Sequence, residues 1–149
     1  MKLLIAISDS ESNILAGQSA GCWAFTEKKD RNGISKQFYL QPRNYSMPGN
    51  YITFWTSEKE GINPQGFMGL GIITGNQIRG KVERNIWNDR DYYGAIPFKL
   101  ISSKKMPIDE VRKLYGSTWN RSFNVLNGNL PEGKITDEQM KEFIIYMIT

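Results

Sequence analysis

The sequence contains no histidine and only one cysteine, Cys22, among its 149 residues. Without histidine the chain lacks the usual general base, the commonest metal ligand and every Ser-His or Cys-His nucleophile pair. A single cysteine excludes an internal disulfide and a cysteine-rich zinc site. We therefore expect a protein that is not an enzyme and that needs no metal or other cofactor.

Long apolar runs are also missing from the sequence. No segment approaches the ~20 apolar residues that a membrane-spanning helix needs. The apolar run after Lys2 ends at Ile7, which is too short for the core of a signal peptide, and no small-residue cleavage site follows it. We expect a cytoplasmic protein that does not associate with membranes.

Aromatic residues are plentiful, and positive charge is in mild excess. Lysine and arginine outnumber aspartate and glutamate by 19 to 15, and aromatic residues make up 12% of the chain. Taken alone, this excess is most simply a solvated basic surface, although it also favours polyanionic partners. Because aromatic side chains provide stacking faces for unstacked bases, the combination points to nucleic acid as the partner.

Apolar runs alternate with turn residues and helix caps throughout the chain, which predicts one α+β domain over residues 1–149. Strands are expected at 3–7, from residue 22, and at 50–56, 66–73 and 96–101. Helices are expected up to about Ser19, with either Ser8 or Ser10 as the N-cap, and over 108–114 and 137–147. Residues 77–93 are expected to form a long irregular loop, and 102–107 a connection into the second helix.

The predicted strand at 66–73 carries three glycines, Gly66, Gly69 and Gly71. Glycine inside a strand indicates a bulge or a close approach of backbones, as in the wall of a curved barrel. The expected architecture is therefore a curved mixed sheet or open β-barrel flanked by helices. The periodic helix at the C-terminal end suggests that these residues were excised from a larger protein.

Two tryptophans stand out as candidate site residues. Trp23 follows Gly21 at the start of a predicted strand, and on its own it would be interpreted as a core residue. Trp87 lies in a polar segment beside Asn88 and Arg90, where it either fills the core or presents a face. Together they can sandwich a flipped-out base between them, at ~1–3 kcal/mol per stacking contact. A nearby asparagine can hydrogen-bond the edge of that base.

The order of motifs along the chain resembles a YTH domain. Residues 4–23 are similar to the opening of that family: an apolar strand, a serine, a polar helix start with Asn13, then Gly-x-Trp. Trp87 falls where the family has a loop tryptophan. Residues 50–57 resemble the family's central strand, and residues 66–71 resemble its glycine-bearing strand. Residues 98–107 resemble its later strand with Met-Pro, and residues 117–121 resemble the segment that contacts the nucleic-acid backbone.

The resemblance implies a PUA-like fold, shared by YTH and EVE domains, and a site that encloses the methyl group of N6-methyladenine in an aromatic cage. It implies that Trp23 and Trp87 are cage walls and that Asn13 and Asp9 contact the base edge. The main chain near Ala24 would accept from the methylated amino group. The third wall stays open among Tyr92, Tyr93 and Trp55, of which Trp55 sits in a central strand and suits the core.

The resemblance also implies contacts with the nucleic-acid backbone. Arg121 would contact a phosphate, and Lys28 and Arg90 are further basic candidates, although a turn lysine is more simply a solvated charge. Ile7 stands where the family has a lysine, which removes one phosphate contact and weakens the case for RNA. Ala24 replaces the family's serine or cysteine, and this change is harmless if only the main chain at this position contacts the base.

The stretch from Trp87 to Phe98 is similar to EVE-type modules at the N-termini of McrB-like GTPases, which act in restriction systems that recognise modified DNA. This similarity implies a specificity domain for N6-methyladenine in DNA, with a fused GTPase domain and a nuclease subunit as partners. One alternative is an RNA-binding PUA-like module, with or without a preference for N6-methyladenosine. Another is a small-ligand binder or enzyme that uses the same pocket.

Overall fold

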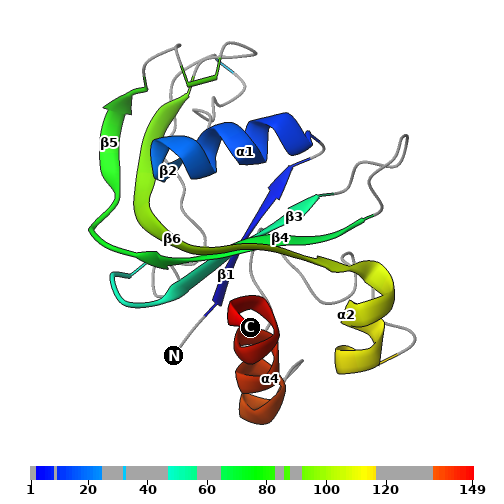
Figure 1. The fold of residues 1–149 in the computed structure, drawn as a ribbon. Coiled ribbons are helices and arrows are strands. Elements are labelled where there is room, and N and C mark those ends of the chain that lie inside the picture. Colours follow the sequence, from blue (N-terminus) through cyan, green and yellow to red (C-terminus); the bar gives the residue numbers. More distant parts are fainter. Residues whose placement is uncertain are drawn as a thin grey trace.

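The computed structural model describes residues 3–8, 10–24, 32, 47–56, 65–82, 86–87, 92–116 and 136–149. These residues form six strands and three helices (Figure 1). The strands are β1 (Leu3–Ser8), β2 (Cys22–Ala24), β3 (Tyr51–Thr56), β4 (Gly66–Ile73), β5 (Ile78–Lys81) and β6 (Tyr93–Pro107). The helices are α1 (Glu11–Ala20), α2 (Ile108–Tyr115) and α4 (Asp137–Ile148). None of the helices in these ranges is long and apolar enough to cross a bilayer.

The strands make one curled mixed sheet in the order β1-β3-β4-β6-β2, with β5 also paired to β6. The β1–β3 pair is parallel, and the other pairs are antiparallel. The 15-residue strand β6 bends round α1, so that its second half pairs with β4 and its first half with β2 and β5 (Figure 1). The prediction of an α+β fold with a curved mixed sheet is confirmed.

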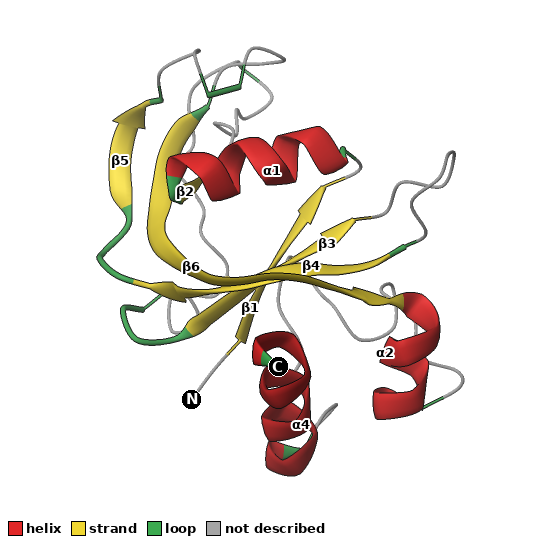
Figure 2. Ribbon diagram, viewed as in Figure 1, coloured by secondary structure: helices red, strands yellow, loops and turns green. Residues whose placement is uncertain are grey.

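Helices cover both faces of the sheet, with α1 on one face and α2 and α4 on the other (Figure 2). Side chains of β1 alternate between the two layers, because successive residues of a strand point to opposite faces. Leu3 and Ile5 join the core beneath α2 and α4, whereas Leu4 and Ala6 join the core beneath α1. The sheet therefore separates two hydrophobic cores.

The glycines of β4 produce the predicted irregularity. The register with β6 shifts between Met68 and Leu70, and Gly69 has a φ of 79°, a left-handed conformation that favours glycine. The side-chain amide of Gln18 donates to the Met68 carbonyl at 2.9 Å. Because a Cβ at Gly69 would lie 2.6 Å from Gln18 Nε2, the bulge also allows α1 to approach the sheet closely.

Local capping determines where α1 begins and ends, as predicted. The Ser10 hydroxyl accepts from the Asn13 amide at 3.3 Å, and Gly21 ends the helix in a left-handed conformation with a φ of 73°. The Gly21 carbonyl then accepts from the Phe98 amide at 2.9 Å. This bond ties the end of α1 to β6 and directs the chain into β2, which places Trp23.

Two predictions for the second half of the sheet are wrong. Part of the predicted irregular loop at 77–93 forms β5, and the strand predicted at 96–101 extends over Tyr93–Pro107. Ser103, Lys104 and Lys105 are exposed, so no apolar alternation marks this end of the strand. Pairing with β4 and β5 extends β6, and such contacts between distant segments override local patterns.

Candidate nucleic-acid interface

An aromatic cluster lies where α1, β2 and the first half of β6 meet. Trp23, in β2, is paired in register with Ile96 of β6 and is partly exposed. Its ring makes edge-to-face contacts with Phe54 at 5.6 Å and with Trp87 at 6.1 Å between centroids. Phe54 lies under the sheet-facing side of α1, so it supports Trp23 from the core. The strand and helix thus bring the two predicted tryptophans together.

Trp87 is held firmly within the cluster and is only 4% exposed. Its indole Nε1 donates to the main-chain carbonyl of Asn13 in α1 at 3.0 Å. The Tyr92 ring packs against it with centroids 5.2 Å apart and planes at 50°. Tyr92 is therefore the predicted third-wall residue that the structure places beside Trp87.

The rings of Trp23 and Trp87 meet nearly at a right angle, and we call this arrangement the aromatic corner. A base sandwiched between two indoles needs parallel faces roughly 7 Å apart, twice a van der Waals contact. The planes of Trp23 and Trp87 stand at 85° in direct contact, so the expected insertion of a base between them is wrong for this geometry. A base can instead stack on the exposed part of one ring and place a substituent against the other.

Ala24 lies at the base of this corner. It is 7% exposed, pairs in register with Ala95 of β6, and belongs to a small cluster with Trp87 and Ala95. Small side chains on both strands leave room for the aromatic rings above them. Asn13 is partly buried on α1, and its carbonyl is the acceptor for Trp87.

Trp55 is not part of this site. It is 1% exposed, packs edge-to-face on Phe67 at 4.9 Å, and lies in the core between the sheet and helices α2 and α4. A register shift between Thr53 and Trp55 accompanies this placement. Trp55 is therefore a core residue and not a cage wall, which corrects its inclusion among the base-binding candidates.

Several predicted contacts lie outside the described residues. Asp9, Lys28, Arg90 and Arg121 fall in those segments, so their roles stay predictions. Tyr93 opens β6, but its side chain is not described.

Gly17 and Phe54 belong to the site, and sequence reasoning missed both. Phe54 looked like one more apolar residue of a central strand. Gly17 stands inside a helix, where glycine is unfavourable relative to alanine by roughly 0.5–1 kcal/mol. An interior helical glycine was therefore the signal that could have pointed to a close packing contact at this position.

Burial raises the pKa of the Cys22 thiol above its ordinary value. Cys22 precedes Trp23 in β2 and is free of any disulfide. With a raised pKa it stays a neutral thiol near pH 7 and is a poor nucleophile. Within the described ranges, no group of three or more cysteine, aspartate or glutamate side chains is arranged to hold a metal ion. The cluster is therefore suited to stacking and hydrophobic contact.

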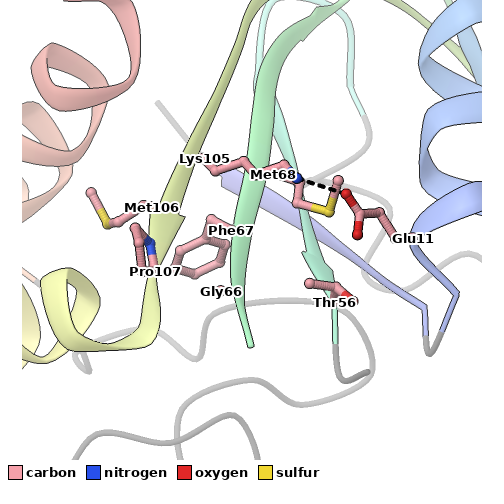
Figure 3. A pocket seen from close by; sticks show the side chains of 8 residues that line it. All are labelled: Glu11, Thr56, Gly66, Phe67, Met68, Lys105, Met106 and Pro107. Atoms are coloured by element: carbon pink, nitrogen blue, oxygen red, sulfur yellow. Dashed lines mark hydrogen bonds and ion pairs between the residues drawn. The ribbon is translucent and has the colours of Figure 1, made fainter. Parts of the chain in front are cut away.

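A pocket of about 120 Å³ lies elsewhere, near the N-terminal end of α1 (Figure 3). Its lining shares no residue with the aromatic cluster: Glu11, Thr56, Gly66, Phe67, Met68, Lys105, Met106 and Pro107. The Lys105 ammonium pairs with the Glu11 carboxylate at 2.7 Å, as the dashed line in Figure 3 shows. Because these two charges neutralise each other, the pocket attracts a charged ligand less than free basic side chains would.

The described architecture is that of YTH domains. The chain is similar to the YTH domain of Zygosaccharomyces rouxii MRB1 protein in complex with N6-methyladenosine RNA, with a TM-score of 0.59 and 16% identity over 99% of this chain and 86% of that chain. It is similar to the Pho92 YTH domain in complex with m6A, with a TM-score of 0.62 and 11% identity over 99% and 84% of the two chains.

A third similar structure is the Toxoplasma CPSF4 YTH domain in complex with a 7 mer m6A-modified RNA. Its TM-score is 0.59 at 15% identity, over 98% of this chain and 89% of that chain. The sequence matches no protein-family model and no curated protein. At these identities the similarity shows that the chain has the fold of these YTH domains, and the aromatic corner lies on that fold.

Proposed function

We propose that this protein recognises nucleic acid that carries N6-methyladenine, with the modified base held in the corner formed by Trp23 and Trp87. The observation that carries the proposal is the right-angle contact of these two indoles, with Trp23 partly exposed. A base that stacks on Trp23 can direct a methyl group toward the second ring. Burying a methyl-sized group contributes ~0.8 kcal/mol, roughly a fourfold preference, before any closer aromatic contact is counted.

Polar groups of the same elements suit the rest of the base. The Asn13 side chain has both donor and acceptor atoms for the base edge. N6-methyladenine keeps one amino hydrogen, and a main-chain carbonyl near Ala24 would accept it. The Trp87 indole donates to the main-chain carbonyl of Asn13 in α1. The same helix therefore holds both the ring proposed to contact the methyl group and the side chain proposed to contact the base edge.

We favour RNA as the substrate class. Two of the similar structures were solved with N6-methyladenosine RNA or m6A-modified RNA, and a third, of the mmi1 protein, is described as an RNA complex. An unpaired base in single-stranded RNA enters such a site without the penalty of leaving a duplex. N6-methyladenine in DNA, with a fused GTPase domain and a nuclease subunit, stays a prediction from the sequence. So do the absence of catalysis and of a cofactor, and the cytoplasmic location.

A binding panel tests the proposal. Short RNA and single-stranded DNA oligonucleotides that contain one adenine, either plain or N6-methylated, would be titrated against the protein with fluorescence anisotropy. Matched strands with 5-methylcytosine serve as modification controls. We expect the wild-type protein to bind N6-methylated RNA several-fold more tightly than plain RNA. A stronger preference for methylated DNA would support the restriction-type alternative, and equal affinity for all strands would contradict the proposal.

Two variants locate the effect. Trp23→Ala should remove the preference for the methylated strand, because the stacking face is lost. Ile145→Ala provides the control, since Ile145 is exposed on α4, across the sheet from the aromatic cluster. The control should keep the wild-type preference. If Trp23→Ala folds and still discriminates as the wild type does, the base does not bind at this corner.

A further inference from the structure

Gly17 lies in the middle of α1, buried against both tryptophans of the aromatic corner. A Cβ atom at this position would lie 3.0 Å from Trp87 Cζ2, 3.2 Å from Trp23 Cε3 and 3.0 Å from the Cys22 carbonyl oxygen. All three separations are shorter than ordinary van der Waals contact. A side chain at residue 17 would therefore require the two rings and the Cys22 carbonyl to move by a few tenths of an ångström.

The backbone does not explain why glycine stands here. Gly17 is absent from the glycines with positive φ, and it lies inside a regular helix from Glu11 to Ala20. Alanine would adopt the same conformation and would favour the helix more strongly. The missing side chain at this position thus serves the approach of the two rings to the helix axis.

Asn13 provides the second contact between α1 and the corner. Residues four apart in a helix lie on the same face, so the Asn13 carbonyl and Gly17 are presented side by side. The carbonyl accepts from Trp87 Nε1 at 3.0 Å, while the ring edge rests on Gly17. One turn of α1 thus fixes Trp87 by a hydrogen bond to Asn13 and by van der Waals contact with Gly17.

Trp23, in β2, also packs against Gly17. Its ring edge and the carbonyl of the preceding Cys22 both face Gly17, and Phe54 supports the ring from the core. Displacing either indole would alter the 85° angle and the 6.1 Å separation between them. The angle and the separation of the two indoles therefore both depend on their contact with Gly17.

We propose that Gly17 is a positioning residue that determines the angle and depth of the aromatic corner, and thereby its selectivity for a methylated base. The proposal rests on the function proposed above. A side chain at residue 17 pushes one indole outward, so the methyl group loses contact with the second ring. The predicted phosphate contacts involve residues outside α1, so the affinity for plain RNA should be nearly preserved.

The test compares Gly17→Ala with Ser19→Ala, an exposed position on the same helix. Both variants and the wild type are titrated with plain and N6-methylated RNA. For Gly17→Ala we expect the ratio of the two Kd values to fall to near one, with the Kd for plain RNA changed by less than about twofold, ~0.4 kcal/mol. Ser19→Ala should keep the wild-type ratio. A wild-type ratio in a folded Gly17→Ala protein overturns the proposal.

Circular dichroism separates this proposal from the proposed function. Two indoles in edge contact give an exciton couplet, which reports their geometry without any ligand. Gly17→Ala should change the couplet, and Ser19→Ala should not. A wild-type protein that does not discriminate between the RNAs contradicts the proposed function, whereas an unchanged couplet in Gly17→Ala contradicts the positioning role.

A second variant tests the same contact through stability if Gly17→Ala is too unstable for binding measurements. Phenylalanine at residue 87 lacks the Cζ2 atom that the new methyl group would meet, but it also loses the indole bond to Asn13. The loss of stability in the double variant Gly17→Ala/Trp87→Phe should therefore be smaller than the sum of the losses in the two single variants. Additive losses would show that the steric conflict lies elsewhere and would overturn the proposal.

Discussion

The indole Nε1 of Trp87 donates to the main-chain carbonyl of Asn13, at 3.0 Å and across 74 residues of sequence. Trp87 is almost fully buried, so its N–H group would lose its bond to water without this partner. The carbonyl also lies within α1, where helical geometry pairs it with the amide of Gly17. Because a carbonyl oxygen can accept two hydrogen bonds, both interactions are compatible.

Replacing Trp87 with phenylalanine should lower the free energy of unfolding by about 1–3 kcal/mol, because a hydrogen bond is lost and a small cavity is left. Urea unfolding followed by circular dichroism measures the change. Trp23→Phe is the matched control, since the structure shows no hydrogen bond from the Trp23 side chain within the described residues. Equal stability of Trp87→Phe and the wild type would indicate that the indole bond contributes nothing.

Binding of either RNA should weaken as salt concentration rises, because phosphate contacts release counterions. The slope of log K against log salt should be about −0.7 for each phosphate contacted in a single strand. The ratio of affinities for methylated and plain RNA should stay nearly constant over the same range, since the methyl contact is uncharged. Titrations at several salt concentrations test both statements. A ratio that falls with salt would mean that the preference is electrostatic.

Phe143→Ala should lower the free energy of unfolding by about 3–5 kcal/mol, as expected for a large aromatic ring removed from a core. Phe143, on the buried side of α4, is 0% exposed, and its ring centroid lies 5.2 Å from that of Phe67 in β4. Ile145→Ala, at an exposed position of the same helix, should change stability by less than about 0.5 kcal/mol. Thermal unfolding of the three proteins provides the comparison, and similar losses in both variants would contradict the packing of α4.

Burial raises the pKa of the Tyr115 phenol above its ordinary value of 10.0, with a smaller contribution from the negative charge of Glu142. Since the folded-state pKa exceeds the unfolded one, this contribution to stability is complete below pH 10 and declines as the pH rises toward the folded-state value. The melting temperature should therefore fall above about pH 10. Tyr115→Phe should show a shallower fall, and parallel curves would argue against a buried phenol.

Much of the local structure follows from the sequence. The caps at Ser10 and Gly21 bound α1, and the capping box of Thr136 and Gln139 begins α4, because these signals act within one helical turn. The glycine-rich pattern of β4 likewise indicated its bulge. The course of β5 and β6 could not be predicted in this way, since it depends on hydrogen bonds between strands that are far apart in the chain.

For the candidate site, the residue types and neighbours of Trp23 and Trp87 indicated a stacking site, and the resemblance to YTH domains added Asn13 to it. The tertiary structure decided how they meet: as a right-angled corner, with Tyr92 beside it and Trp55 in a separate core. Ring orientation depends on packing against residues distant in sequence, above all Gly17 and Phe54, and no local pattern contains that information.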